Sequence, residues 1–433
     1  MQTLALTSLI ILFILNLFIF WPGQVSPDSL AQLKEALAGT YTDPNPPIMA
    51  IVWHYLLFIF PYTTGMLIFH LTLLYSSCFI FFQAFKKYKV KYFYLIYPLL
   101  PPILFYSSSI WKDVGFAFAY LFVGASTTYF AMHKKRPSTL QLAGITLILF
   151  YGTAAKFQAV YCAPFMLMGI CYILNNFKLN LKTLLYTIIA QLALLVCINQ
   201  FNSFVVTTEK KSDYWKYVKI YDLAGMSIEL DQPIFPEYIL EYKNFSFSLI
   251  KEKFNYERVD DIVFFKDSPI PRKETENDQV SLLKKWQHAV VKHPVAYLKH
   301  RYKNWRRLLF TKPLEKLEKL DFNSFGGLKW FASLQNKKSF LSQLIFFTLG
   351  FIRYIFSFIF VFIFMLCYLA LGIFKRRETL GVILIILNGA ALMMVLALYF
   401  LSMASLLRYV YISVCLVHAS HPIAYLLIKR RCS

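Results

Sequence analysis

The sequence predicts an all-helical protein that crosses a membrane several times. Of its 433 residues, 58% are hydrophobic and 18% are aromatic. A water-soluble chain of this length has too little interior to bury so much apolar surface. The apolar residues also gather in runs of about twenty, which is the length that a helix needs to span the hydrocarbon core. These two observations predict a polytopic membrane protein.

Ten apolar runs are long enough to span. They cover residues 3–21, 64–85, 92–108, 114–132, 139–155, 158–175, 183–203, 352–373, 379–402 and 409–428. No basic stretch precedes the first run and no small-residue cleavage site follows it. We therefore expect an uncleaved span at this position and not a signal peptide.

The apolar stretch 48–60 is shorter than a typical span and is bounded by prolines. If it does not cross and the N-terminus is cytoplasmic, the cytoplasmic loops hold fifteen Lys and Arg and the short outer loops hold four. Basic residues favour cytoplasmic loops. This rule predicts that 48–60 is a helix lying on the outer surface of an inner (plasma) membrane, with both termini in the cytoplasm.

This topology divides the chain into three parts. Residues 1–203 form an N-terminal transmembrane module whose first outer loop, 22–63, carries the candidate site. Residues 204–340 form a small, mainly helical extracytoplasmic domain, and residues 341–433 supply the C-terminal transmembrane helices. The stretch 281–310 is basic and amphipathic, so we expect it to lie along the membrane surface.

The net charge of +22 does not indicate a nucleic-acid partner, because the basic residues stand in short clusters between apolar runs. Membrane lipids are the expected partner. The seven cysteines show no disulfide or metal-ligand spacing. Three histidines, His288, His293 and His300, lack a completing cysteine or carboxylate, so we expect solvated helix residues and no metal site.

The first outer loop has the features of a short helix that presents carboxylates at the membrane surface. Ser26 can cap a helix, Pro27 fits its first position, and an acid at Asp28 favours the first turn. Gly39 is a suitable stop. On this helix Asp28 and Gln32 share a face, and Asp43 follows in a proline-rich turn. Asp28 is either a helix-terminal charge or a proton acceptor for a hydroxyl group.

Further ionisable and polar residues stand at the outer ends of other spans. They are Lys112, Asp113, Lys156, Gln158, Arg408 and Tyr409. Interfacial anchoring explains the Trp-Lys-Asp sequence, and snorkelling explains Lys156. The alternative is a site, since lysine and arginine suit a phosphate and a nearby carboxylate suits hydroxyl activation. The pattern then predicts group transfer from a phospholipid-like donor.

At these residues the chain resembles the GT-C superfamily of integral-membrane glycosyltransferases, and within it the bacterial branch that uses polyprenyl-phosphate-linked sugars. The similar segments, in order, are PGQVSPDSLAQLKEALAGTYTDPNPP (22–47), WKDVGFAF (111–118), AKFQAVYCAPFML (155–167), HPVAYLKHRYKNW (293–305) and LRYVY (407–411). Asn45 stands where that branch usually has histidine, and Lys156 and Gln158 replace an arginine and an asparagine.

The resemblance implies an inverting transferase that acts on the extracytoplasmic face. A polyprenyl-phosphate sugar would be the donor, and a surface glycan or lipid the acceptor. Asp28 would act as general base with Asp113 orienting the acceptor, while Lys112, Lys156 and Arg408 would neutralise the departing phosphate. No cofactor is implied. The first loop has no pair of adjacent acids that would hold a metal ion tightly, and a loosely bound divalent cation is left as an alternative.

Two other functions remain open. O-antigen-type polymerases and ligases also combine many spans with a large outer loop, but they depend on outer arginines and histidines. Transporters and flippases place ionisable residues or broken helices near the middle of the membrane. The depth of the charged residues therefore distinguishes an enzyme at the membrane surface from a transporter.

Overall fold

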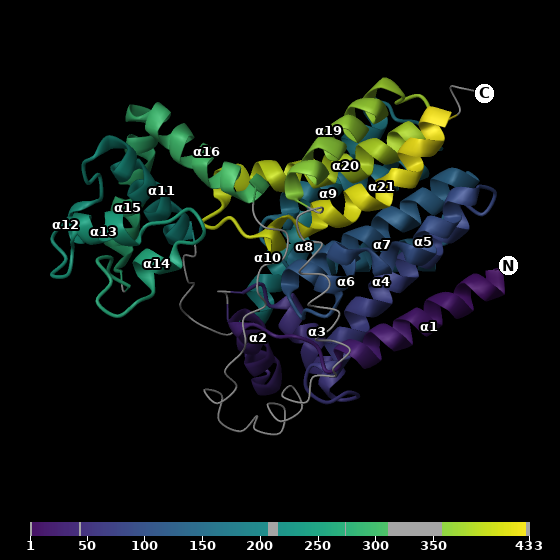
Figure 1. The fold of residues 1–433 in the computed structure, drawn as a ribbon, viewed down its shortest axis with the longest axis horizontal. Helices are drawn as coiled ribbons and strands as arrows, with labels where there is room; N and C mark the ends of the chain where they lie inside the picture. The colour runs from purple at the N-terminus through teal and green to yellow at the C-terminus, as the bar shows by residue number, and fades with distance from the viewer. Residues whose placement is uncertain (1, 43–44, 207–214, 273, 311–356, 430–433) are drawn as a thin grey trace. The chain divides into compact units, whose positions relative to one another are not determined.

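The computed structural model describes residues 2–42, 45–206, 215–272, 274–310 and 357–429. Within these ranges every named element is a helix, and extended backbone pairs only at isolated bridges. The all-helical prediction is therefore confirmed for the described residues. The chain forms two compact units (Figure 1). We name them the apolar unit, residues 1–209, 312–395 and 410–433, and the polar unit, residues 210–311 and 396–409.

Most helices belong to the apolar unit. They are α1 (Gln2–Phe20), α2 (Pro27–Ala38), α3 (Ile48–Leu57), α4 (Thr64–Ala84), α7 (Lys112–His133), α8 (Thr139–Ala154), α9 (Ala159–Leu174), α10 (Leu181–Val205), α19 (Phe358–Phe374), α20 (Thr379–Leu401) and α21 (Tyr411–Lys429). The last turns of α20 belong to the polar unit. Helix α7 is central and packs against α4, α8, α9 and α21 (Figure 1).

Six described helices are long and apolar enough to cross a membrane: α1, α4, α7, α10, α20 and the stretch Leu407–Lys429 that contains α21. Four further apolar helices, α3, α8, α9 and α19, are shorter. These helices indicate a membrane-embedded protein. The expected count of ten is not reached by length and composition among the described residues.

The expected span at 92–108 is not one helix. It is broken into η1 (Lys89–Tyr92), α5 (Phe93–Ile96), η2 (Tyr97–Leu99) and α6 (Pro101–Ser107). Prolines at 98, 101 and 102 remove backbone donors and clash with the preceding turn, which ends a helix. The prediction of a regular span here is wrong because it weighed apolar length and not these prolines.

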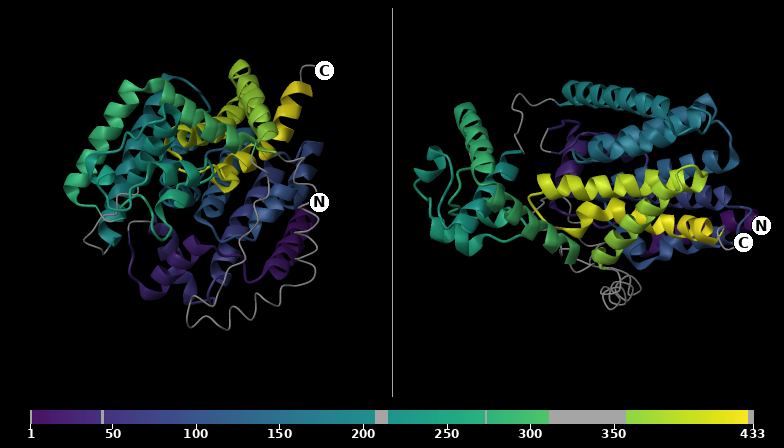
Figure 2. Two further views of the ribbon diagram at one scale, coloured as in Figure 1. Left: turned by 60° about the vertical axis from the view of Figure 1, so that its left-hand side comes forward. Right: turned by 90° about the horizontal axis from the view of Figure 1, so that it is seen from above.

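The loops of the apolar unit gather at two ends. At the end that we name the site end, the Trp21 indole donates to the Thr64 hydroxyl at 3.1 Å, and Gln24 pairs with Ser109. At the other, named the basic end, Lys134 Nζ donates to Thr379 Oγ1 at 2.9 Å. Helix α1 begins and α21 ends at the basic end (Figure 2).

The stretch 48–60 begins and finishes at the site end. Asn45, just before α3, accepts a hydrogen bond from Lys112 at 2.8 Å. Thr63, just after it, donates from Oγ1 to the Pro22 carbonyl at 2.8 Å. A helix whose two flanks meet the same cluster of loops does not cross the unit. That this helix lies on the outer surface of the membrane stays a prediction.

The polar unit contains α11 (Trp215–Leu230), α12 (Glu237–Leu240), α13 (Phe247–Lys253), α14 (Asp260–Val263), α15 (Glu276–Lys292), α16 (Pro294–Phe310) and η4 (Leu407–Val410). Its core has apolar side chains from α11 and from the helices and loops that follow, among them Tyr221, Phe235 and Leu282. The sequence places 396–409 with the C-terminal helices, but contacts assign this segment to the polar unit. Its Met403 carbonyl accepts from the Val259 N–H at 3.0 Å.

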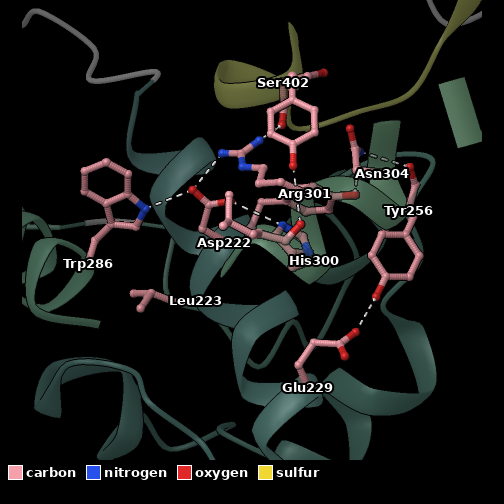
Figure 3. Close-up of polar contacts among 12 residues, drawn as sticks. Asp222, Leu223, Glu229, Tyr256, Trp286, His300, Arg301, Asn304 and Ser402 are labelled. Carbon is pink, nitrogen blue, oxygen red and sulfur yellow. Dashed lines mark hydrogen bonds and ion pairs between the residues drawn. The ribbon is translucent and has the colours of Figure 1, made fainter. Parts of the chain in front are cut away.

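A buried charged cluster lies inside the polar unit (Figure 3). Arg301 Nη2 donates to Asp222 Oδ2 at 2.6 Å, and Trp286 Nε1 donates to the same oxygen at 2.9 Å. Arg301 Nη1 donates to the Ser402 carbonyl at 2.5 Å. Arg301 thus ties α16 to α11 and to the segment 396–409.

His300 belongs to this cluster and is fully buried, with Nε2 lying 3.2 Å from Asp222 Oδ1. The expectation that it is a solvated helix residue is wrong, whereas His288 is exposed. Burial lowers the pKa of His300, although the neighbouring Asp222 carboxylate acts in the opposite direction. Pro294 begins a separate helix, α16. This helix buries His300 and Arg301, whereas α15 buries Leu282 and Ala289.

Candidate functional site

Helix α2 forms as its local sequence predicts. Ser26 is the N-cap in extended conformation, Pro27 occupies the first helical position, and Gly39 ends the helix with φ of 65°. Asp28 lies exposed in the first turn, whereas Gln32 is only 1% exposed. The face that these two residues share therefore passes from the surface to the interior of the site end.

The N-terminal ends of α2 and α7 are held side by side. The Gln24 N–H donates to the Ser108 carbonyl at 2.8 Å, and the Ile110 N–H donates to the Gln24 carbonyl at 2.8 Å. Ser29 Oγ then donates to the Ile110 carbonyl at 2.6 Å. Since both helices begin beside this link, the first turns that carry Asp28 and Asp113 lie at the same end of the apolar unit.

Asp113 and Lys156 form a buried ion pair. Asp113 lies in the first turn of α7, and Lys156 lies in the short connection between α8 and α9. Lys156 Nζ donates to Asp113 Oδ1, and the two residues are 4% and 3% exposed. Opposite charges stabilise each other strongly where water is excluded. The pair joins two of the loops from which the sequence predicts site residues.

Lys112 turns to a different neighbour. Its Nζ donates to Asn45 Oδ1 at 2.8 Å, and Asn45 lies in the first loop. Adjacent helix positions point in different directions, which fits the hydrogen bond of Lys112 to Asn45 and the ion pair of Asp113 with Lys156. The Asn45 amide oxygen thus accepts a hydrogen bond from the ammonium group of Lys112.

Glu35 is a site residue that the sequence analysis missed. It is three residues after Gln32 on α2, so the two lie on one face of the helix. Thr42 Oγ1 donates to Glu35 Oε1. Burial raises the pKa of Glu35, while the Thr42 hydrogen bonds and the positive charge of Lys112 lower it in part. The helical spacing places Glu35 near Gln32, but only the structure shows that this face turns inward.

Several buried polar atoms at the site end make no hydrogen bond within the described part of the chain. They are Gln32 Nε2, Glu35 Oε2, Ser109 Oγ, both ring nitrogens of His70, and the hydroxyl of Tyr151. Buried polar groups in folded proteins nearly always have partners. Water or a polar ligand can supply the partners that these atoms lack within the described residues.

The other predicted residues are distributed over both units. Gln158 is half-buried and is the N-cap of α9, two residues after Lys156. Arg408 and Tyr409 belong to the polar unit, where the Arg408 guanidinium lies 5.2 Å from the Tyr409 ring centre. Their part in the site stays a prediction. Asp43 lies outside the described residues.

The chemistry of the site end follows from these placements. Two lysines and two carboxylates come from α2, the first turn of α7 and the connection between α8 and α9: Glu35, Lys112, Asp113 and Lys156. In the described ranges no three His, Cys, Asp or Glu side chains are grouped so as to hold a metal ion. The arrangement can bind an anionic group through the lysines and accept a proton at a carboxylate.

Comparisons with known proteins do not identify a family. No protein-family profile matches this chain, and no curated protein or solved structure is significantly similar to it.

Proposed function

We propose that this protein is a membrane glycosyltransferase. It transfers a sugar from a polyprenyl-phosphate-linked donor to a hydroxyl group of a surface glycan or lipid. The observation that carries the proposal is the meeting of the Asp113–Lys156 ion pair with Lys112 and the carboxylate-bearing helix α2 at one end of an apolar helical unit.

The lysines support a donor that carries phosphate. When the bond between the sugar and the phosphate breaks, negative charge grows on the departing phosphate oxygen. Lys112 and Lys156 stand on neighbouring loops and present ammonium groups, which bind phosphate as compact positive charges. The apolar unit around them suits the hydrocarbon chain of a lipid donor. The lysines would therefore stabilise the phosphate most in the transition state, when negative charge grows on its departing oxygen.

A carboxylate supports the other half of the reaction. An acceptor hydroxyl becomes a better nucleophile when a positioned carboxylate removes its proton, a contribution of about 10²–10⁴-fold. Attack on the face opposite the phosphate inverts the configuration of the sugar. An acid of the first loop would supply this base, and Asp113 would orient the acceptor.

The depth of the charges favours a transferase over a transporter. Asp113 is the second residue of α7, and Lys156 follows the last turn of α8. Transporters hold their ionisable groups near the middle of the membrane. The basic loops at the opposite end support the proposal that both termini are cytoplasmic and that the site faces the extracytoplasmic side of an inner membrane.

The function is tested by mass spectrometry of surface glycans from cells with and without the gene, and from cells that carry Lys112→Gln. We expect a glycan to lose one sugar in the deletion strain and in the variant. Purified protein should transfer sugar from a polyprenyl-phosphate donor to extracted acceptor. An identical glycan profile with and without the gene, together with no transfer from any polyprenyl-phosphate sugar, would refute the proposal.

A further inference from the structure

Helix α2 directs two polar side chains away from solvent. Gln32 is 1% exposed and Glu35 is half-buried, whereas Asp28 on the preceding turn is exposed. The three residues lie within one sector of the helix because their spacings are four and three. Of the two first-loop acids on this face, Glu35 lies deeper in the site end.

Gln32 and Glu35 each have one buried polar atom that makes no hydrogen bond with a described residue. Glu35 Oε1 accepts from Thr42, but Oε2 is buried and makes no hydrogen bond with a described residue. Gln32 Nε2 is likewise buried and makes no hydrogen bond with a described residue. A donor and an acceptor that are one helical turn apart can together bind a group that both gives and accepts a hydrogen bond. A sugar hydroxyl is such a group.

The charges around Glu35 also suit proton transfer. Its burial disfavours the ionised form, so its pKa is raised, and a carboxylate with a raised pKa is the stronger base. The positive charge of Lys112 acts against this shift and keeps the carboxylate available. Lys112 therefore lies close enough to act on Glu35, the proposed proton acceptor, and it also belongs to the proposed phosphate-binding lysines.

We propose that Glu35 is the general base of this site and that the Gln32 amide positions the acceptor hydroxyl. This inference rests on the proposed glycosyltransferase function and replaces Asp28 in that role. The acceptor O–H proton moves to Glu35 Oε2 while the acceptor oxygen bonds to the anomeric carbon of the donor sugar. The bond from that carbon to the phosphate oxygen breaks, and its electron pair leaves with the polyprenyl phosphate. Glu35 then returns the proton to water.

Matched amide variants separate the two acids. Glu35→Gln keeps an oxygen that can accept from Thr42, so the fold is expected to remain. With a polyprenyl-phosphate sugar and extracted acceptor, we expect kcat to fall about 10²–10⁴-fold with little change in the donor KM. Asp28→Asn should stay within a few-fold of the wild type. Gln32→Leu should raise the acceptor KM more than it lowers kcat.

The pH profile provides a readout that a structural role would not change. In the wild type, kcat/KM should fall on the acidic side as the base becomes protonated, and Glu35→Gln should lose this limb. An active wild type in which Glu35→Gln keeps its rate, or Asp28→Asn loses it, would overturn the inference alone. A wild type that transfers no sugar would refute the proposed function as well.

A second measurement needs no variant. A hydrophobic carbodiimide modifies protonated carboxyl groups, and peptide mass spectrometry locates the adduct. We expect Glu35 to be modified in parallel with the loss of activity, and bound acceptor to protect both. Inactivation that follows modification of Asp28, with Glu35 unmodified, would contradict the inference even if Glu35→Gln does not fold.

Discussion

Lys156 donates a hydrogen bond to Asp113 in a site from which nearly all solvent is excluded. The two residues are 43 positions apart in the sequence. Their pairing connects the beginning of α7 to the connection between α8 and α9. An ion pair in this position holds the two segments at a defined separation, and it keeps an ammonium group beside the first turn of α7 without leaving a buried charge unpaired.

Removal of one partner of this pair should cost more than removal of both. Asp113→Asn or Lys156→Met leaves one charge buried, and we expect a loss of about 3–5 kcal/mol in unfolding free energy. The double variant Asp113→Asn, Lys156→Met should recover much of this loss. Denaturant unfolding in detergent measures the cycle. The exposed pair Lys251–Asp231 is the control and should contribute about 0–1 kcal/mol. Additive single losses would show that the two charges do not act as a pair.

Lys112 should affect turnover more than stability. Lys112→Gln keeps a donor for Asn45 but removes the charge, so the growing charge on the phosphate is stabilised less. We expect kcat to fall about 10²–10³-fold. Lys34→Gln, on the exposed side of α2, is the matched control and should leave the rate unchanged. Equal rates for wild type and Lys112→Gln would exclude a role for this lysine in the transition state.

Gly115 should tolerate no side chain. A Cβ at this position would lie 2.6 Å from His70 Nε2 and 2.7 Å from the Tyr151 hydroxyl, and both rings are buried. We expect Gly115→Ala to destabilise the protein by about 1–3 kcal/mol through overpacking. Gly144→Ala in α8, where nothing lies within 4 Å, should instead stabilise by about 0.5–1 kcal/mol. Thermal unfolding of both variants compares them, and a stable Gly115→Ala protein would contradict the close approach of the two rings.

His300 should make stability depend on pH. Its folded-state pKa is lowered by burial below the usual 6.5, so the unfolded chain binds the proton more readily. Stability is then full above about 6.5 and falls as the pH decreases below that value toward the folded-state pKa. Unfolding of wild type and His300→Gln across this range measures the effect. The variant should lose the dependence, while exposed His288→Gln should retain it; an unchanged slope in His300→Gln would assign the effect to another group.

Local features of the fold could be predicted from the sequence because they depend on neighbouring residues. The cap at Ser26, the proline at position 27 and the stop at Gly39 define α2 within one segment, and the structure confirms them. Apolar length predicts α4 and α7 in the same way. It fails at 92–108, where the prolines interrupt the helix.

The composition of the site was only partly predictable. Lys112, Asp113 and Lys156 were found because they stand at the ends of different apolar runs on one predicted side of the membrane. Glu35 was missed because a glutamate on an amphipathic helix is ordinary until the structure shows that its face turns inward. Arg301 and His300 look like surface residues of a basic helix, and only packing against Asp222 reveals that they are buried.

The sequence alone determined that the chain is helical, apolar enough for a membrane, and divided by charged loops, since these properties follow from runs of adjacent residues. Tertiary structure decided which residues meet: Asp113 with Lys156, Lys112 with Asn45, and Arg301 with Asp222 and Ser402. These partners are from 43 to 101 residues apart. Contacts over such distances depend on how whole helices pack. The two residues of each pair meet only when burial of the apolar surface around them brings their helices together.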